Sequence, residues 1–248
     1  MIRMQRVAFS YDNTPFIREL SCEMADGRIT GLLGPNGSGK STCLKLCAGL
    51  IRPQSGEILV GGASVSGRNP REFARALAFL PQSRPLPMIT VRSLVENGRF
   101  PYLGFSRRLG PGDRTAVDSA LQMTGMAPLA ERELRTLSGG ERQKAYLAML
   151  IAQGAQHLLL DEPTTYLDIN HQLELMDILR TLRDAGRCVV MVLHDIDLAA
   201  AVCDNVIVMQ RGGVVHSGAA AALFDSGALE RAYGVRPLPG TGTRFERI

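Results

Sequence analysis

The sequence predicts an α/β fold in which a parallel or mixed β-sheet carries packed helices and a helical subdomain is inserted into the chain. Three observations predict it. Short apolar runs of strand length alternate with segments of helical periodicity, and a glycine-rich turn joins one such run directly to a helix. The middle of the chain shows little strand signal. A chain of 248 residues suffices for one α/β core with a smaller subdomain.

The composition excludes several classes of protein. With 45% hydrophobic and 21% charged residues, the chain resembles a folded soluble protein and no low-complexity polymer. No apolar run approaches the roughly 18–20 residues of a membrane span, and the first residues lack the apolar stretch of a secretory signal. We therefore expect a cytoplasmic protein. The net charge of +4 is mild and spread out, so no nucleic-acid partner is expected.

The first predicted strand, Ile29–Leu33, is short and apolar and ends in the glycine-rich turn. Beyond the turn, apolar residues recur at helical spacing and predict a helix. These residues are Cys43, Leu46, Cys47 and Leu50. The five cysteines form no CxxC pair, and we expect them to be buried apolar residues.

Two later segments, Leu158–Leu160 and Cys188–Leu193, are typical of buried strands, each followed by polar residues that could face a ligand. Val206–Met209 and Val214–His216 predict a hairpin with its glycines in the turn. The last stretch, Gly234–Ile248, is punctuated by proline and glycine and predicts a loosely packed tail.

The glycine-rich turn matches the phosphate-loop pattern G-x-x-x-x-G-K-[ST] in full, directly after a strand and directly before a helix. Its glycines let several backbone N–H groups point at one anion, reinforced by the helix N-terminus. Lys40 can reach the β- and γ-phosphates, and the Ser41 hydroxyl can bind Mg²⁺, so the loop predicts ATP as the ligand. The loop consists of Gly34, Pro35, Asn36, Gly37, Ser38, Gly39, Lys40, Ser41 and Thr42.

A pair of carboxylates follows the strand Leu158–Leu160 and predicts hydrolysis as well as binding. Asp161 at the strand end can hold the hydration shell of Mg²⁺. Glu162 then lies beside the γ-phosphate, where its carboxylate can polarise an attacking water.

The segment Leu137–Gln143 resembles the signature sequence of ABC-family ATPases, and the rest of that family's pattern follows in order from about Val7 to Phe224. The resemblance implies a single ABC ATPase domain: a P-loop NTPase (RecA-like) core with a mixed sheet and an N-terminal antiparallel β portion. Residues 1–84 and 155–224 would form the core, 85–154 the helical subdomain and 225–248 the C-terminal tail.

The same resemblance implies roles for four further residues. Tyr11 stands where the family has the aromatic that stacks on adenine. Gln82 matches the glutamine that contacts Mg²⁺ and the attacking water and links the site to the membrane subunit. Asp168 belongs to the dimer-contacting loop, and His194 matches the histidine that contacts the γ-phosphate.

The signature also has a physical meaning of its own. Ser138, Gly139 and Gly140 open a predicted helix that runs through Ala145, Leu147 and Leu150, and free N–H groups at a helix start form a second anion site. One chain with two phosphate-binding ends suggests two copies arranged head to tail, and the family is built in this way. Glu141 and Lys144 replace the commoner glutamine and arginine of the family, which we expect to tune function and not to abolish it.

Two stretches narrow the resemblance to importers. Thr90–Tyr102 and Thr164–Gln172, the latter with Tyr166 in place of a small residue, look like segments of iron–siderophore importer ATPases. Haem and cobalamin importers share much of the first stretch and remain alternatives.

The implied partners are a second copy, membrane permease subunits at the cytoplasmic face of the cell membrane and, indirectly, a solute-binding protein. A soluble ABC ATPase acting on nucleic acid or the ribosome is a further alternative, but the chain has no long coiled coil and no second ATPase domain.

Overall fold

The computed structural model describes residues 1–12, 14–104, 108–165, 167–237 and 245–247. A six-stranded sheet of order β10-β9-β3-β8-β7-β6 forms its centre. Neighbouring strands run parallel from β9 to β6, and β10 is antiparallel to β9, so the sheet is mixed as expected. Its strands are β3 (Ile29–Leu33), β6 (Leu77–Leu80), β7 (His157–Leu160), β8 (Cys188–Val192), β9 (Asn205–Gln210) and β10 (Gly213–Ala219).

A second, antiparallel sheet of order β2-β1-β4-β5 forms the N-terminal β portion. Its strands are β1 (Ile2–Tyr11), β2 (Thr14–Met24), β4 (Ser55–Val60) and β5 (Ala63–Ser64). Helix α1 (Lys40–Cys47) shares one buried apolar cluster with both sheets, to which it contributes Leu44. This cluster anchors the helix that follows the phosphate loop.

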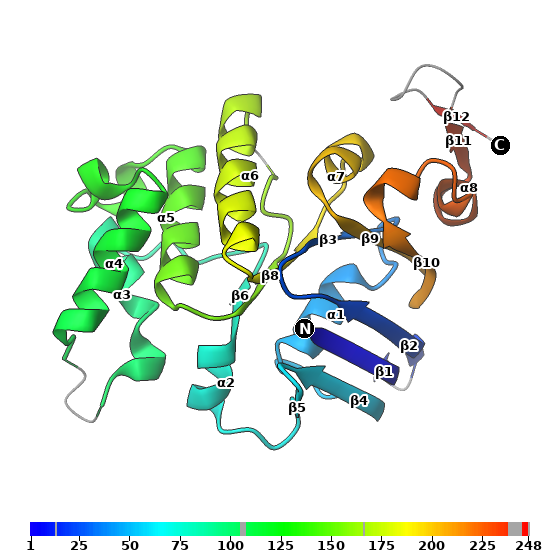
Figure 1. The fold of residues 1–248 in the computed structure, drawn as a ribbon, viewed down its shortest axis with the longest axis horizontal. Helices are drawn as coiled ribbons and strands as arrows, with labels where there is room; N and C mark the ends of the chain where they lie inside the picture. The colour runs from blue at the N-terminus through cyan, green and yellow to red at the C-terminus, as the bar shows by residue number, and fades with distance from the viewer. Residues whose placement is uncertain (13, 105–107, 166, 238–244, 248) are drawn as a thin grey trace.

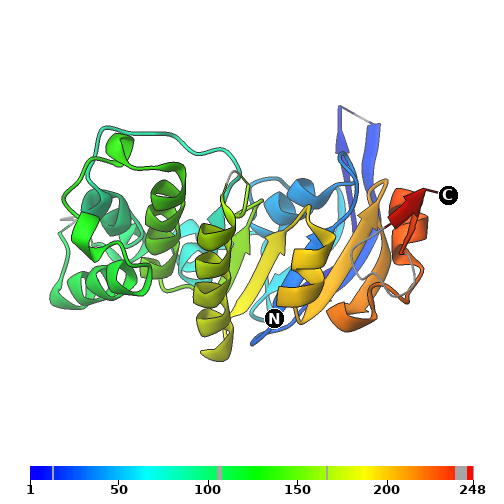
Figure 2. The same ribbon diagram turned by 90° about the horizontal axis from the view of Figure 1, so that it is seen from above.

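The helices lie outside the two sheets. Figures 1 and 2 show α3, α4 and α5 grouped at one end of the molecule and the antiparallel sheet toward the other. The described residues between 85 and 154 form helices, 3₁₀ turns and one isolated bridge between Thr90 and Glu133, with no named strand. The helices are α2 (Pro70–Ala76), α3 (Val91–Asn97), α4 (Pro111–Met123), α5 (Gly139–Ala152), α6 (Ile169–Asp184), α7 (Ile196–Val202) and α8 (Ala228–Tyr233). Single 3₁₀ turns occupy Phe100–Tyr102, Ala127–Leu129, Leu134–Thr136 and Ala220–Ala222.

Two expectations need correction. Helix α1 ends at Cys47 and does not reach Leu50, which is 61% exposed, because Gly49 adopts a left-handed conformation (φ 67°) that stops the helix. The stretch Gly234–Ile248 is not uniformly loose. Its described part includes the short hairpin of β11 (Val235–Pro237) and β12 (Phe245–Arg247), and the Phe245 ring stacks on Phe224.

Among the described residues, no helix combines the length and apolarity needed to cross a membrane. The five cysteines are buried, as expected, and their thiols are free.

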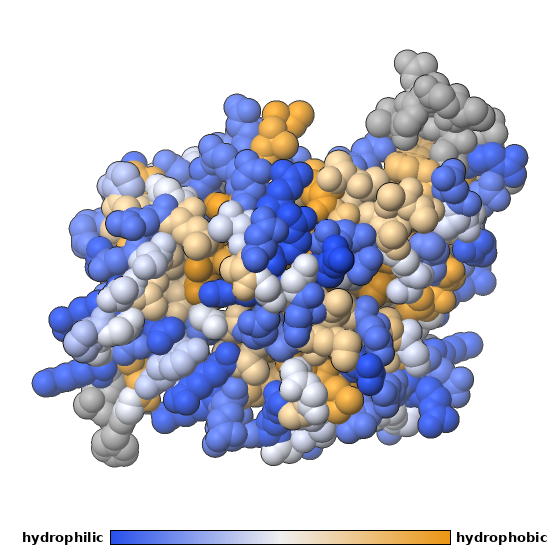
Figure 3. Space-filling view, in the orientation of Figure 1, coloured by the Kyte–Doolittle hydropathy of each residue, from blue (hydrophilic) through white to orange (hydrophobic). Residues whose placement is uncertain are grey.

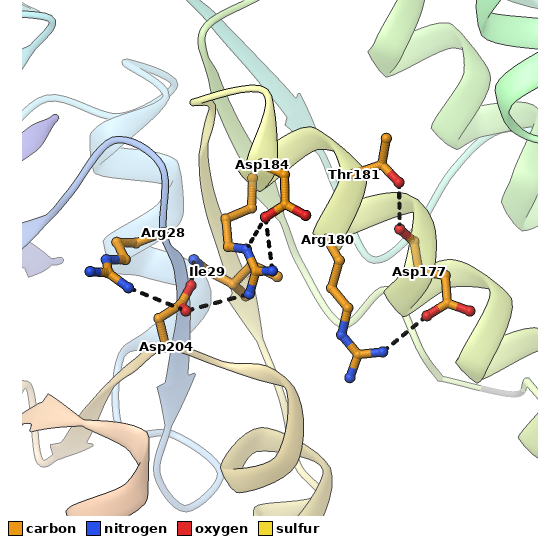
Figure 4. A network of polar contacts seen from close by, with 8 residues as sticks. Arg28, Ile29, Asp177, Arg180, Thr181, Asp184 and Asp204 are labelled. Atoms are coloured by element: carbon orange, nitrogen blue, oxygen red, sulfur yellow. Dashed lines mark hydrogen bonds and ion pairs between the residues drawn. The ribbon is translucent and has the colours of Figure 1, made fainter.

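A polar network ties the central strands together at the edge of the sheet opposite the phosphate loop (Figure 4). Asp204 accepts a hydrogen bond from the backbone N–H of Ile29 (2.7 Å), the first residue of β3. The same carboxylate pairs with Arg28 (3.5 Å) and with Arg183 (3.4 Å) near the end of α6. Asp204 thus connects β3, β9 and α6. The other ends of these elements carry loops at the edge of the sheet where the phosphate loop lies.

We predict that Asp204→Ala lowers the free energy of unfolding by about 1–3 kcal/mol, because it leaves the Ile29 N–H without its acceptor and removes the ion pairs with Arg28 and Arg183. Chemical denaturation of the purified chain measures this change. The matched control is Asp177→Ala, which removes only an exposed ion pair with Arg180 and should cost less than about 1 kcal/mol. Equal losses from both substitutions would contradict the structural role of Asp204.

Candidate functional site

The ends of four neighbouring strands place the candidate residues in one region. Gly34 follows β3 and Asp161 follows β7 directly, while Gln82 and His194 lie two residues beyond β6 and β8. Since these strands are parallel, their carboxyl ends share one edge of the sheet, where ligands bind in open α/β folds. The order β3-β8-β7-β6 thus brings together residues that are far apart in the chain.

The phosphate loop borders a hollow of about 450 Å³ at this edge. Gly37 (φ 77°) and Gly39 (φ 106°) adopt conformations that side-chain-bearing residues rarely take, so the loop needs glycine at both positions. Helix α1 starts at Lys40 with its N-terminus at the hollow, which favours an anion there. The hollow is lined by Phe16, Asn36, Gly37, Gly39, Lys40, Ser41, Thr42, Gln82, Glu162 and His194.

Contacts from behind hold the phosphate loop in this shape. The backbone N–H of Gly212, in the turn between β9 and β10, donates to the Ser38 carbonyl (3.0 Å). The Gly34 N–H donates to the hydroxyl of Tyr233 (2.6 Å), the last residue of α8. A side chain at position 34 would lie 2.2 Å from the Met209 carbonyl oxygen, so this glycine is required for close approach. Helix α8, near the C-terminal end of the chain, therefore contacts the loop.

The Lys40 ammonium group is buried, with only 6% of the residue exposed, and donates to the carbonyls of Gly34 (2.7 Å) and Pro35 (3.1 Å). Burial lowers the pKa of Lys40, although the nearby carboxylates of Glu162 and Asp161 oppose this change. A cation that bonds only neutral carbonyls in a confined site can gain strongly from an arriving phosphate. Lys40 lines the hollow, and its contact with a phosphate stays a prediction.

Asp161 and Ser41 form the part of the site suited to a hard cation. The Ser41 hydroxyl donates to Asp161 Oδ1 (2.9 Å), and Asp161 is only 4% exposed. Burial raises the pKa of Asp161 and the charge of Glu162 adds to this, while the Ser41 hydrogen bond lowers it. The described residues contain no group of three or more His, Cys, Asp and Glu that could hold a metal by themselves. One carboxylate with one hydroxyl fits Mg²⁺, which keeps waters and shares substrate phosphates.

Glu162 is held by three side chains in an unusual backbone conformation. His194 Nε2 donates to Oε1 (2.6 Å), while Gln82 Nε2 (2.7 Å) and the Thr165 hydroxyl (3.2 Å) donate to Oε2. Burial raises the pKa of Glu162, but the hydrogen bond and charge of His194 and the other two hydrogen bonds outweigh this effect, and the net pKa is lowered. The φ angle of 50° is strained for a residue with a side chain, as is common at functional sites. Glu162 is therefore an oriented, ionised carboxylate at the hollow.

The aromatic side chains beside the loop include one residue that the sequence analysis missed. The Tyr11 hydroxyl lies 3.2 Å from the Thr42 hydroxyl, and its ring meets the rings of Phe9 and Phe16 edge-on at 4.7 and 5.3 Å. Phe16 itself lines the hollow. An aromatic residue in the strand after Tyr11 was the only sequence signal for it, and Thr165 had no signal beyond its place near Glu162.

The structure does not bring the signature residues or Asp168 into the hollow of the phosphate loop. Ser138 caps α5 and forms a capping box with Glu141: its hydroxyl accepts from the Glu141 N–H (3.2 Å), and the Glu141 carboxylate accepts from the Ser138 N–H (2.7 Å). Gly139 lines a different hollow of about 510 Å³. Asp168 caps α6, and Tyr166 lies outside the described residues.

Known proteins resemble this chain in sequence and in fold. A family model described as ABC transporter matches residues 17–165. The chain is 37% identical to the ferric enterobactin transport ATP-binding protein FepC of Escherichia coli (strain K12), with 97% of this chain and 92% of that protein covered. It is 40% identical to the cobalamin import ATP-binding protein BtuD of Halobacterium salinarum, with 92% of this chain and 57% of that protein covered.

Among solved structures, cbiO1 from Clostridium perfringens, part of the ABC transporter complex cbiONQ, superposes with a TM-score of 0.81. The two are 27% identical, with 93% of this chain and 92% of that chain covered. The match of the family model, the relative covered over almost its whole length and the shared fold lead to one conclusion. The chain belongs to the ABC transporter family.

Proposed function

We propose that the chain binds ATP with Mg²⁺ and hydrolyses it as the ATP-binding subunit of an importer for iron chelates such as ferric siderophores. The observation that carries the proposal is the carboxylate of Glu162, held by Gln82 and His194 at the rim of the hollow that the phosphate loop borders. An oriented carboxylate beside a phosphate site is the arrangement that general-base hydrolysis needs.

In this proposal, residues that line the hollow or lie beside it bind different parts of the nucleotide and its metal ion. The loop backbone and Lys40 bind the phosphates, Ser41 and Asp161 hold Mg²⁺, and the bound Mg²⁺ neutralises phosphate charge. Tyr11 and Phe16 supply aromatic surface for adenine.

The attacking water is positioned by three side chains. Glu162 orients the water and accepts its proton. Gln82 and His194 keep the carboxylate in place and contact the water and the γ-phosphate. The lowered pKa of Glu162 keeps this base ionised at neutral pH.

A second copy completes the site in this proposal. Ser138 and Gly140 start α5 away from the phosphate-loop hollow of their own chain, so we place them against the ATP of a partner arranged head to tail. Exposed apolar side chains beside Asp168 support a contact at this end of α6. Ile169 is 74% exposed and Leu173 is 53% exposed, and Figure 3 shows hydrophobic atoms at the upper end of α6. Such a patch is typical of an interface.

The permease is proposed to dock on a hollow of about 710 Å³ beside β6. Leu50, Ile51, Phe73 and Phe79 give it apolar walls from the segment after α1, from α2 and from β6. Phe79 is three residues before Gln82. A permease segment bound in this hollow would therefore be linked to the catalytic site by the short end of β6 and the residues that follow it. Residues 85–154 would then act as a helical subdomain next to this contact, at the cytoplasmic face of the membrane.

The iron chelate is the cargo that the resemblance of Thr90–Tyr102 and Thr164–Gln172 to siderophore importers favours, and the name of the FepC relative agrees. The BtuD relative carries cobalamin in its name, and haem is the other alternative. Growth on defined sources separates them. A deletion strain should fail on ferric siderophore as sole iron source and recover with the wild-type gene but not with Glu162→Gln. Normal growth on iron sources together with loss of cobalamin uptake would contradict the iron proposal.

We predict that Glu162→Gln lowers the kcat of ATP hydrolysis about 10²–10⁴-fold, because the amide cannot accept the proton of the water. ATP binding should stay intact, and the variant should accumulate as a nucleotide-bound dimer. Steady-state phosphate release and size-exclusion chromatography with ATP measure the two effects. Wild-type turnover would exclude Glu162 as the base.

Lys40→Ala should weaken ATP binding itself by about 10–100-fold, the loss expected for a hydrogen bond to a charged group. Fluorescent-nucleotide titration of the purified chain tests this. An unchanged affinity would count against the phosphate role of Lys40.

Ser138→Arg should leave ATP binding to each monomer within about twofold of wild type while blocking the dimer, because a large cation replaces the small helix cap at the proposed interface. The titration above and light scattering in the Glu162→Gln background report the two properties separately. A dimer that still forms with ATP would refute the head-to-tail arrangement.

A further inference from the structure

His171 links two elements that the proposed function uses and that the sequence analysis treats separately. It lies in the first turn of α6, three residues after Asp168. Its ring lies against Gly140, in the first turn of α5. The local sequence around His171 predicts no role for this residue.

The imidazole fills the space that a side chain at position 140 would need. A Cβ added to Gly140 would lie 2.4 Å from Cδ2 of His171 and 2.7 Å from its Cγ and Nε2, well inside van der Waals contact. A Cβ added to the neighbouring Gly139 meets no atom within 4 Å. Of these two signature glycines, only Gly140 is therefore packed against the His171 ring.

Two hydrogen bonds fix the orientation of the ring. Asp168 Oδ1 accepts from the backbone N–H of His171 (2.9 Å) and from its Nδ1 (2.8 Å). These bonds lower the pKa of Asp168, so its carboxylate is ionised and can only accept. Nδ1 of His171 therefore donates its hydrogen to Asp168, and the opposite side of the ring faces Gly140.

A second contact joins the same two helices one turn further along. Lys144 of α5 forms an ion pair with Glu174 of α6. His171 also lies close enough to α5 to affect it electrostatically. The pKa of Glu141 is lowered first by the hydrogen bonds from Ser138, and the charges of Arg132 and His171 add to this.

We propose that His171 is a positioning residue that locks the signature start, Ser138–Gly140, to the dimer-contacting residue Asp168. The two elements that one subunit presents to its partner's nucleotide then move as one unit. The inference rests on the proposed head-to-tail dimer and deepens it. It names the residue that sets the geometry of the two elements that one subunit contributes to its partner's nucleotide site.

The test measures ATP-driven dimerisation of the full chain in the Glu162→Gln background. His171→Ala should raise the ATP concentration for half-maximal dimer formation at least about tenfold, the scale of a coupling between two elements. ATP affinity of the monomer should stay within about twofold, because His171 does not line the phosphate-loop hollow. The matched control on α6 is Arg180→Ala, which removes an exposed ion pair and should leave both quantities unchanged.

Two conservative variants separate the contacts of the ring. His171→Asn keeps a donor for Asp168 and loses the ring over Gly140. His171→Phe keeps a ring and loses the donor. Each should dimerise better than His171→Ala and less well than the parent, because each retains one of the two contacts.

The outcomes distinguish this inference from the function on which it rests. Failure of the Glu162→Gln parent to dimerise with ATP would overturn both. Dimerisation of the parent and of His171→Ala at equal ATP concentrations would overturn only the role of His171. A parallel loss of monomer ATP affinity or thermal stability in all three His171 variants would assign the residue a merely structural role and would also overturn it.

Discussion

The contact between His194 and Glu162 is the interaction on which the candidate site depends. It joins the residues that follow β8 and β7, two neighbouring parallel strands. It also holds the carboxylate of Glu162, a residue whose backbone conformation is strained. A strained residue persists only where its surroundings determine its position. Here Gln82, after β6, and Thr165 supply the remaining hydrogen bonds. The parallel order of the sheet is thus the constraint, because it aligns the strand ends from which these side chains extend.

The charges of the site are arranged for a ligand with both anionic and cationic parts. Burial lowers the pKa of Lys40 and raises that of Asp161, so each group is held where its charged form costs free energy. A phosphate beside Lys40 and a divalent cation beside Asp161 would relieve both costs together. This coupling gives a physical reason for nucleotide and Mg²⁺ to bind as one unit in the proposed function.

The sequence predicts those parts of the fold and site that depend on local pattern. The strand Ile29–Leu33 has the expected bounds, and the strand before Asp161 begins only one residue earlier, because apolar runs and a phosphate loop are short-range signals. The helical spacing at Leu50 misleads because Gly49 ends the helix, a conformational effect that periodicity does not report. Tyr233 and His171 could not be found, since their partners Gly34 and Gly140 are remote in the chain and meet them only in the folded protein.

The central claim is that one nucleotide site is built from two copies of the chain. The structure of the Glu162→Gln variant with ATP and Mg²⁺, determined by crystallography or electron microscopy, tests it most directly. The account predicts a dimer in which each ATP lies between Lys40 of one copy and Ser138 of the other. An ATP bound to Lys40 of a monomer, with Ser138 open to solvent, would contradict it.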